Sequence, residues 1–331
     1  MGARTALDGA ALACEDRCMV NDHRTGPAAA AAPLLPADLA LGPVHLIVTD
    51  LDRSTSFYER SIGLRLRERD GDRARLGAGG GDLLVLHERP GARPAGRHAG
   101  LYHFALLHPT RGELGRAARR LAETGTSIEG ASDHGISEAI YLPDPDGNGI
   151  ELAADRPRER WGDLRDPTTI GPAPLDLPGL IAPVAAEEPA AGAGPGLRVG
   201  HLHLHVGDIA GALAFYRDVV GFELMTDFGS AAFVAAGGYH HHLGLNTWRG
   251  RGVPPAPDGA VGLERWTVEL DAEALAALRG RFAAAGIAAE PAGGGFRVRD
   301  PWGIATSFQP AGRDRRTTLG VEGPTATGPP G

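Results

Sequence analysis

Imidazole and carboxylate side chains gather in two stretches of this sequence. The stretch ASDHGISEAIYLPDPDGNGIEL carries His134, Tyr141 and Glu151. A second stretch, GGYHHHLGLNTW, contains three consecutive histidines: His240, His241 and His242. Histidine exchanges protons near neutral pH, and imidazole and carboxylate groups together bind transition metals. The two stretches therefore indicate a metal site, an acid–base site, or both.

The histidine run has a restricted geometry if it belongs to a β-strand. Successive side chains of a strand point to opposite faces, so three adjacent imidazoles do not all reach one site. We interpret residues 237–248 as a strand with one imidazole turned toward the interior of the protein, and this strand is the last one of a repeated unit. Strand geometry alone leaves open whether the inward residue is His240, His241 or His242.

Internal repeats supply the elements that position these residues. The segment LGPVHLIVTDLDRSTSFYERSIGLRL (41–66) aligns without gaps with VGHLHLHVGDIAGALAFYRDVVGFEL (199–224). A weaker pair comprises 100–125 and 262–286. The long repeats predict a strand, an Asp-capped helix ending at Gly, and further strands, and the weaker pair predicts a strand, a helix and a closing hairpin. The sequence thus predicts four βαβββ units, numbered one to four here in chain order.

The predicted fold class is α+β, with two tandem modules of paired βαβββ units. The first module covers 41–155 and the second covers 197–310. A Pro/Ala/Gly-rich linker at 156–196 separates them, and the segments 1–40 and 311–331 have the composition of disordered ends.

Composition excludes several classes of partner. The formal net charge is -8, and the absence of a basic stripe argues against nucleic acid or an anionic membrane. No apolar run is long enough to span a bilayer. The two cysteines, Cys14 and Cys18, form only an isolated C-x3-C pair, which favours a reducing compartment and a cytoplasmic protein. The composition leaves open whether the protein forms a homo-oligomer.

The chain resembles the vicinal oxygen chelate superfamily, which includes glyoxalase I and the extradiol ring-cleaving dioxygenases. The D-x6-FY helix entries and the DPDGNGIEL segment carry this resemblance across both modules. The pattern H-x5-I-Y-x2-D-P-x-G-x3-E, from His134 to Glu151, resembles the extradiol dioxygenase pattern around a carboxylate ligand, with Ser132 as a departure. The two-module layout is similar to that of catechol 2,3-dioxygenases. The resemblance implies that paired βαβββ units form cup-shaped open barrels.

The resemblance implies metal ligands on the first strand of one unit and on the first and last strands of its partner. Pairing units in sequential order completes no ligand set. Crossed pairing of units two and three gives His103, Glu151 and His201, and leaves units one and four without a ligand. A rival assignment uses His45 in place of Pro43, because residues two apart on a strand share a face.

The activity implied by the resemblance is extradiol cleavage of a catechol by O2. The cofactor is Fe(II), with Mn(II) as an alternative, and the partners are a small aromatic diol and O2. His241 is expected to take and return a proton, while Tyr141 and His134 hydrogen-bond to oxygens of the reactants. The alternatives are a glyoxalase-like lyase or isomerase and a metal-free binding module. The lyase or isomerase normally requires a further carboxylate ligand.

Overall fold

The computed structural model describes residues 35–164 and 171–312. The predictions made for Cys14, Cys18 and most of the two chain ends lie outside the described residues. Within the described ranges, no helix combines the length and the apolar character that crossing a membrane requires.

Units one and three fold as the repeat predicts. Unit one comprises β2 (Val44–Val48), α1 (Leu51–Phe57), the π-helical turn η1 (Tyr58–Ile62), β3 (Arg65–Asp70), β4 (Arg73–Gly77) and β5 (Asp82–Glu88). Unit three comprises β11 (Arg198–His205), α4 (Ile209–Leu213), η4 (Ala214–Val220), β12 (Glu223–Asp227), β13 (Ala231–Ala235) and β14 (Leu243–Asn246). Asp50 and Asp208 cap the two helices through backbone N–H groups, and Gly63 and Gly221 end them in the left-handed conformation.

Units two and four have a longer helix after their first strand. Unit two comprises β6 (Gly100–His108), α2 (Arg111–Glu123), β7 (Gly130–Asp133), β8 (Ser137–Pro143) and β9 (Gly149–Asp155). Unit four comprises β15 (Gly262–Leu270), α5 (Ala272–Ala284), β16 (Glu290–Ala292), β17 (Gly295–Arg299) and β18 (Ala305–Pro310). The α+β class and the repeated units are thereby confirmed.

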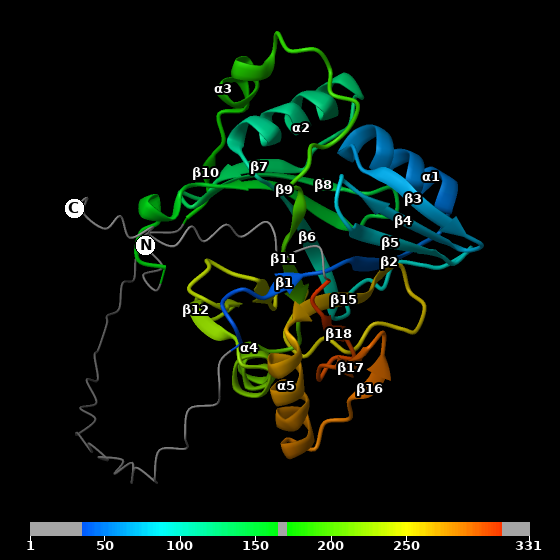
Figure 1. Ribbon diagram of the computed structural model, residues 1–331, viewed down its shortest axis with the longest axis vertical. Helices are drawn as coiled ribbons and strands as arrows, with labels where there is room; N and C mark the ends of the chain where they lie inside the picture. The colour runs from blue at the N-terminus through cyan, green and yellow to red at the C-terminus, as the bar shows by residue number, and fades with distance from the viewer. Residues whose placement is uncertain (1–34, 165–170, 313–331) are drawn as a thin grey trace, which may run out of the picture. The chain divides into compact units, whose positions relative to one another are not determined.

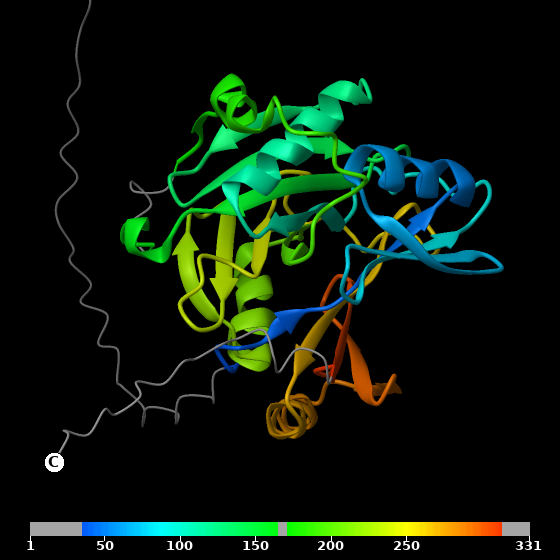
Figure 2. The ribbon, with the colours of Figure 1, turned by 45° about the horizontal axis from the view of Figure 1, so that its top comes forward.

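The units pair crosswise into two nine-stranded sheets (Figures 1 and 2). One sheet joins units two and three in the order β10-β7-β8-β9-β6-β11-β14-β13-β12, where β10 is Ala173–Pro174. The other joins units one and four in the order β16-β17-β18-β15-β2-β5-β4-β3, with β1 (Ala40–Leu41) beside β15. We call the first the histidine sheet and the second the arginine sheet, after the side chains described below. The crossed pairing expected from the ligand positions is confirmed.

Tyrosine–aspartate hydrogen bonds connect the two sheets. The buried Tyr58 hydroxyl of unit one donates to Asp144 in the turn before β9, over 3.0 Å. Its repeat partner Tyr216 donates to Asp300 in the matching turn of unit four, also over 3.0 Å. Each bond runs between units that are consecutive in the chain, so consecutive units stay connected although their strands belong to different sheets.

The connection between units two and three contains ordered short elements. They are η2 (Arg158–Arg160), β10, α3 (Leu177–Ile181) and η3 (Ala182–Val184). Helices α3 and η3 lie against α2 on the outer side of the histidine sheet (Figure 1). The close approach requires Gly115, because a Cβ there would lie 2.6 Å from the Leu180 carbonyl oxygen. An ion pair between Arg116 and Glu187, at 2.6 Å, adds to this contact.

Candidate metal centre

Three central strands of the histidine sheet bring the predicted ligands into one row. In β9, β6 and β11, the residues Glu151, Ala105 and His201 lie opposite one another. His103 lies on β6 two residues before Ala105 and therefore on the same face. Because Ala105 is small and buried, it leaves space over the middle strand for the three polar side chains.

The three side chains converge on the Glu151 carboxylate. Its Oε2 atom is 3.0 Å from Nε2 of His103 and 3.0 Å from Nε2 of His201. One ligand atom from each residue lies within 4.8 Å of the other two. The exposed fractions are only 6% for His103, 3% for Glu151 and 4% for His201. A buried carboxylate facing two imidazoles is a donor set suited to a divalent cation.

Electrostatics favour the protonation states that metal binding needs. Burial lowers the pKa of His103, which keeps its imidazole neutral and able to donate a lone pair. Burial alone raises the pKa of Glu151, but the His201 and His103 imidazoles around its oxygen hold that pKa well below the usual range. The centre therefore presents an ionised carboxylate beside two imidazoles.

The rival assignment of His45 is excluded by the topology. His45 lies on β2 in the arginine sheet, opposite Arg265, whereas His201 lies with His103 and Glu151. Pro43 precedes β2 and supplies no ligand atom. In units one and four the positions that the resemblance assigns to ligands are Pro43, Arg265 and Ser307. A second group of possible metal ligands, His45, His87 and Glu264, lies at other positions of these units.

The histidine run departs from its predicted geometry. Strand β14 begins only at Leu243, so the three histidines lie in the turn that leads into it. Gly237 and Gly238 take φ values of 62° and 64°, a left-handed conformation that turns the chain just before the run. Side chains of a turn do not alternate as in a strand, and both His240 and His241 line the same cavity as the three predicted ligands.

The positions in unit one that match the histidine run also differ from those expected. Strand pairing aligns Val85 with His45, and Gly244 with the repeat partner His203. The run therefore corresponds to residues 81–83, whereas a gap-free extension of the repeat alignment predicts Asp82, Leu83 and Leu84. None of these residues is a histidine, so the arginine sheet contains no counterpart of the run.

His241 packs closely on a predicted ligand. Its ring centroid is 4.0 Å from that of His201 and 4.9 Å from that of Phe233. Burial lowers the pKa of His241 well below the usual value, with further lowering by His201. The buried His241 imidazole is therefore neutral, and it lies directly against the ring of His201.

A carboxylate that sequence reasoning missed orients this histidine. Asp155, at the end of β9, lies 3.0 Å from Nε2 of His240, and Nδ1 of His240 lies 2.8 Å from Nδ1 of His241. The Tyr239 hydroxyl donates to the other Asp155 oxygen over 2.8 Å. If Asp155 accepts from Nε2–H of His240, then Nδ1 of His240 accepts from Nδ1–H of His241. The chain of bonds leaves Nε2 of His241 unprotonated. The available signal was the spacing of Asp155, four residues after Glu151 on the same face of one strand.

Tyr141 and His134 form a hydrogen-bonded pair above the carboxylate. Tyr141 lies opposite Glu151 in the β8–β9 pairing, and its hydroxyl is 2.9 Å from Nε2 of His134 in the β7–β8 turn. Burial and the nearby Glu151 charge raise the pKa of Tyr141, so its hydroxyl keeps its proton. Burial lowers the pKa of His134. The pair provides a neutral hydrogen-bonding edge to the centre.

These groups surround a cavity of about 350 Å³. The volume is in the range of small-molecule sites. Its apolar walls include Ile136, Phe228, Phe233 and Trp248. His203 also lines the cavity, and its buried Nε2 atom has no hydrogen-bond partner within the described part of the chain. The site thus combines apolar walls with a cluster of imidazoles around one carboxylate.

Comparison with known proteins agrees with this architecture. The model of the Glyoxalase/Bleomycin resistance protein/Dioxygenase superfamily matches residues 40–152 and 198–308. The chain belongs to this superfamily. The matched ranges correspond to the two tandem modules, whereas each sheet combines one unit from each module.

A curated relative is similar over most of the chain. The catechol-2,3-dioxygenase of Bacillus subtilis (strain 168) is 44% identical over 271 residues, which cover 80% of this chain and 94% of the relative. Among solved structures, glyoxalase I from Zea mays matches with a TM-score of 0.50 at 19% identity, over 82% of this chain and 93% of that one. A provisionally assigned dioxygenase from Bacillus subtilis subsp. subtilis str. 168 matches with a TM-score of 0.59 at 15% identity, over 85% of this chain and 87% of that one. The structural matches support the fold.

Proposed function

We propose that this protein is an extradiol dioxygenase that cleaves a catechol with O2 at the centre formed by His103, Glu151 and His201. The observation that carries the proposal is the placement of His241, whose ring centroid lies 4.0 Å from that of His201, directly beside this two-histidine, one-carboxylate group. The similarity to a catechol-2,3-dioxygenase supports the same assignment.

The donor set fits a divalent metal bound by His103, Glu151 and His201. We propose Fe(II), with Mn(II) as the alternative, because two imidazoles and one carboxylate are the ligand set of non-haem iron oxygenases. When bound, such a metal supplies open coordination positions for the two substrate oxygens and for O2, and it allows electrons to pass between them. A metal also compensates the burial of Glu151, whose ion-pair partners within the described residues are the imidazoles of His103 and His201.

His241 is the proposed acid–base residue. Its Nε2 atom takes a proton from a catechol hydroxyl and returns it during ring opening. Asp155 and His240 keep that atom unprotonated before substrate binds. The conversion of a neutral imidazole into a cation is assisted by the Asp155 carboxylate through His240, although both imidazoles are buried.

The remaining residues bind and orient the ring. Phe233 and Trp248 provide apolar contact to a flat aromatic substrate, while the Tyr141–His134 pair offers a hydrogen bond to a substrate oxygen. His203 is a second candidate donor, because its Nε2 atom is buried without a partner. Together these groups exclude bulk water and fix the diol edge toward Glu151.

The glyoxalase-like alternative requires a fourth, carboxylate ligand that the structure does not accommodate. The repeat position that matches Glu151 in unit three is Gly244, since Gly244 lies opposite His203 as Glu151 lies opposite Ala105. A Cβ atom at Gly244 would lie 2.8 Å from the His203 ring. A carboxylate side chain at this position would therefore collide with the imidazole, which disfavours the lyase or isomerase.

The test is O2 consumption by the protein loaded anaerobically with Fe(II), measured on adding a series of catechols. The proposal predicts uptake that depends on both metal and catechol and that is absent in Glu151→Gln. The dioxygenase proposal is rejected if protein that retains one metal per chain consumes no O2 with any of the catechols.

A further inference from the structure

The arginine sheet carries its own cluster of polar side chains at the positions that match the metal centre. Strand pairing aligns the row Tyr141, Glu151 and Ala105 of the histidine sheet with the row Arg297, Ser307 and Thr267. It also aligns the row Phe233, Gly244, His203 and His103 with the row Arg75, Val85, His45 and Arg265. The repeat thus replaces an imidazole ligand by the Arg265 guanidinium and the carboxylate ligand by the Ser307 hydroxyl.

Two of these groups have unused hydrogen-bonding capacity. The buried Nε atom of Arg297 has no hydrogen-bond partner, and no ion pair links Arg297 to any of the described residues. The Ser307 hydroxyl is also buried without a partner, and its residue is 1% exposed. Ser307 lies directly opposite Arg297 in the β17–β18 pairing. Buried donors without partners are costly, which points to a ligand that accepts from them.

The charge around these groups is positive. Arg265, Arg297 and Arg75 all lie close enough to His45 to contribute to lowering its pKa, after burial as the main cause. Arg265 forms one ion pair, with its neighbour Glu264 at 2.6 Å. Arg75 is compensated by Asp82 at 3.1 Å. Arg297 is therefore the cation of the cluster that lacks compensation within the described chain.

This cluster is poorly suited to binding a cation. His45, His87 and Glu264 each offer one potential metal-ligand atom, and these three atoms lie within 4.8 Å of one another. Glu264 is the single carboxylate of that group, and Arg265 already occupies its oxygen. A divalent ion there would lie next to a guanidinium, with Arg297 close by, so repulsion would oppose its binding. In the histidine sheet, by contrast, Glu151 contacts only imidazoles among the ion pairs of the described residues.

We propose that the arginine sheet binds a small oxyanion, a carboxylate or a phosphate, between Arg265 and Arg297, with the Ser307 hydroxyl as a further donor. Planar guanidinium groups match the two oxygens of a carboxylate or phosphate better than any other side chain does. One half of the duplicated protein thus holds a cation and the other half an anion at equivalent positions. This proposal does not depend on the activity of the histidine sheet.

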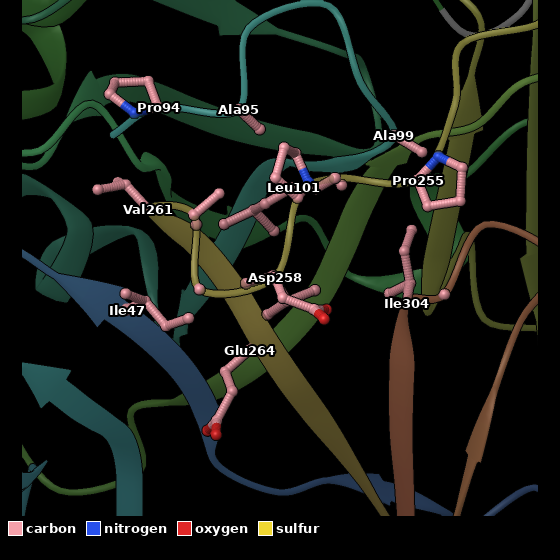
Figure 3. Close-up of a pocket in the computed structure, with 18 of the residues that line it drawn as sticks. Ile47, Pro94, Ala95, Ala99, Leu101, Pro255, Asp258, Val261, Glu264 and Ile304 are labelled. Carbon is pink, nitrogen blue, oxygen red and sulfur yellow. The ribbon is translucent and has the colours of Figure 1, made fainter. Parts of the chain in front are cut away.

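Solvent reaches the cluster beside Glu264, which is 31% exposed at its side chain. Glu264 also forms part of the wall of a cavity of about 660 Å³ between residues 94–101 and 255–264 (Figure 3). In Figure 3 its carboxylate points away from Asp258 and toward strand β2, which carries His45. Glu264 therefore lies between the cavity and the cluster, and its charge competes with an entering anion for Arg265.

The test titrates the metal-loaded protein with sodium phosphate and, separately, with sodium benzoate, and follows the arginine Nε–Hε signals by NMR. Saturable binding is expected for at least one anion, with two arginine signals shifting at one dissociation constant. Arg297→Met and Arg265→Met should each weaken binding by about tenfold to a hundredfold. Arg60→Met, at an exposed residue remote from the cluster in sequence, should leave binding unchanged.

Glu264→Gln separates the anion site from a metal site. Loss of the competing carboxylate should strengthen oxyanion binding, whereas it would weaken a metal site built on His45, His87 and Glu264. The proposal is wrong if neither anion shifts any arginine signal in the unmodified protein. It is also wrong if metal analysis finds a second equivalent of Mn(II) or Zn(II) per chain that Glu264→Gln removes. The NMR titration uses the unmodified protein, so the proposal can be tested even if a variant fails to fold.

Discussion

Replacement of Asp155 by Asn tests the hydrogen-bonded chain that leads to the proposed base. In the native protein the Asp155 carboxylate accepts from Nε2–H of His240, which leaves Nε2 of His241 without a proton. An asparagine amide can instead donate to Nε2 of His240. His240 then carries its proton on Nδ1 and donates to Nδ1 of His241. The proton of His241 moves to Nε2, where a base needs a lone pair.

The size of the effect follows from the bonds that must be given up to restore the productive tautomer. Returning the proton to Nδ1 of His241 sacrifices the new amide–imidazole bond and the bond between the two imidazoles. At about 1 to 1.5 kcal/mol for each of these two neutral hydrogen bonds, the cost is about 2 to 3 kcal/mol. This corresponds to roughly a hundredfold decrease in kcat at 25 °C. KM for the catechol should change little, because Asp155 does not line the cavity.

The assay is the initial rate of O2 consumption with a saturating catechol, normalised to bound Fe(II). Tyr239→Phe is the matched control, because it removes a 2.8 Å hydrogen bond to the other oxygen of the same carboxylate but leaves the bond to His240. The control should keep kcat within about threefold of the unmodified protein, since it alters no tautomer. Metal content should be unchanged in both variants.

Two results would refute this reasoning. A fully metal-loaded Asp155→Asn variant with more than about a third of the native kcat would show that the carboxylate does not set the tautomer. Equal losses in Asp155→Asn and Tyr239→Phe would show that the carboxylate acts only by packing the loop.

Three further predictions concern the metal ligands, the proposed base and the pH dependence of stability. Glu151→Gln should lose most of its metal, measured by elemental analysis after gel filtration, because the single anionic ligand is gone; full metal retention would contradict the ligand assignment. His241→Asn should lower kcat by about a hundredfold to ten-thousandfold at unchanged metal content. His242 lies outside the cavity, so His242→Asn should leave kcat unchanged. Equal decreases in kcat in the two variants would contradict the assignment of His241 as the base. Burial lowers the pKa of His108 to about 4, so protonation favours the unfolded chain and about 3 kcal/mol of stability should disappear as pH falls from 7 to 4. Urea unfolding of His108→Leu should show a pH dependence flatter by that amount, and identical pH profiles would contradict the assignment.

Much of the architecture could be read from the sequence because the units are repeated. Gap-free alignment of the first and third units places Asp50 with Asp208, and both aspartates cap helices as expected. The crossed pairing followed from the ligand positions that the family resemblance implies, since only units two and three together supply His103, Glu151 and His201 there. Repetition thus predicted the elements, and the requirement for a complete ligand set predicted which elements pair.

The contacts that sequence reasoning missed depend on turns and on strand register. The left-handed glycines Gly237 and Gly238 moved the histidine run out of the strand, which no alternation pattern reveals. The group of His45, His87 and Glu264 arises because β2 lies between β5 and β15, a neighbour relation between distant segments. Such relations follow from sheet order, and a single sequence gives no local signal for them.

Identification of the reaction product tests the central claim most directly. Protein loaded anaerobically with Fe(II) should convert a catechol and one equivalent of O2 into a ring-opened product that carries one carboxylate and one aldehyde or ketone, as defined by mass spectrometry and NMR. That product shows cleavage beside the diol. A dicarboxylate from cleavage between the two hydroxyls, or recovery of intact catechol from fully metal-loaded protein, would contradict the assignment of this centre as an extradiol dioxygenase.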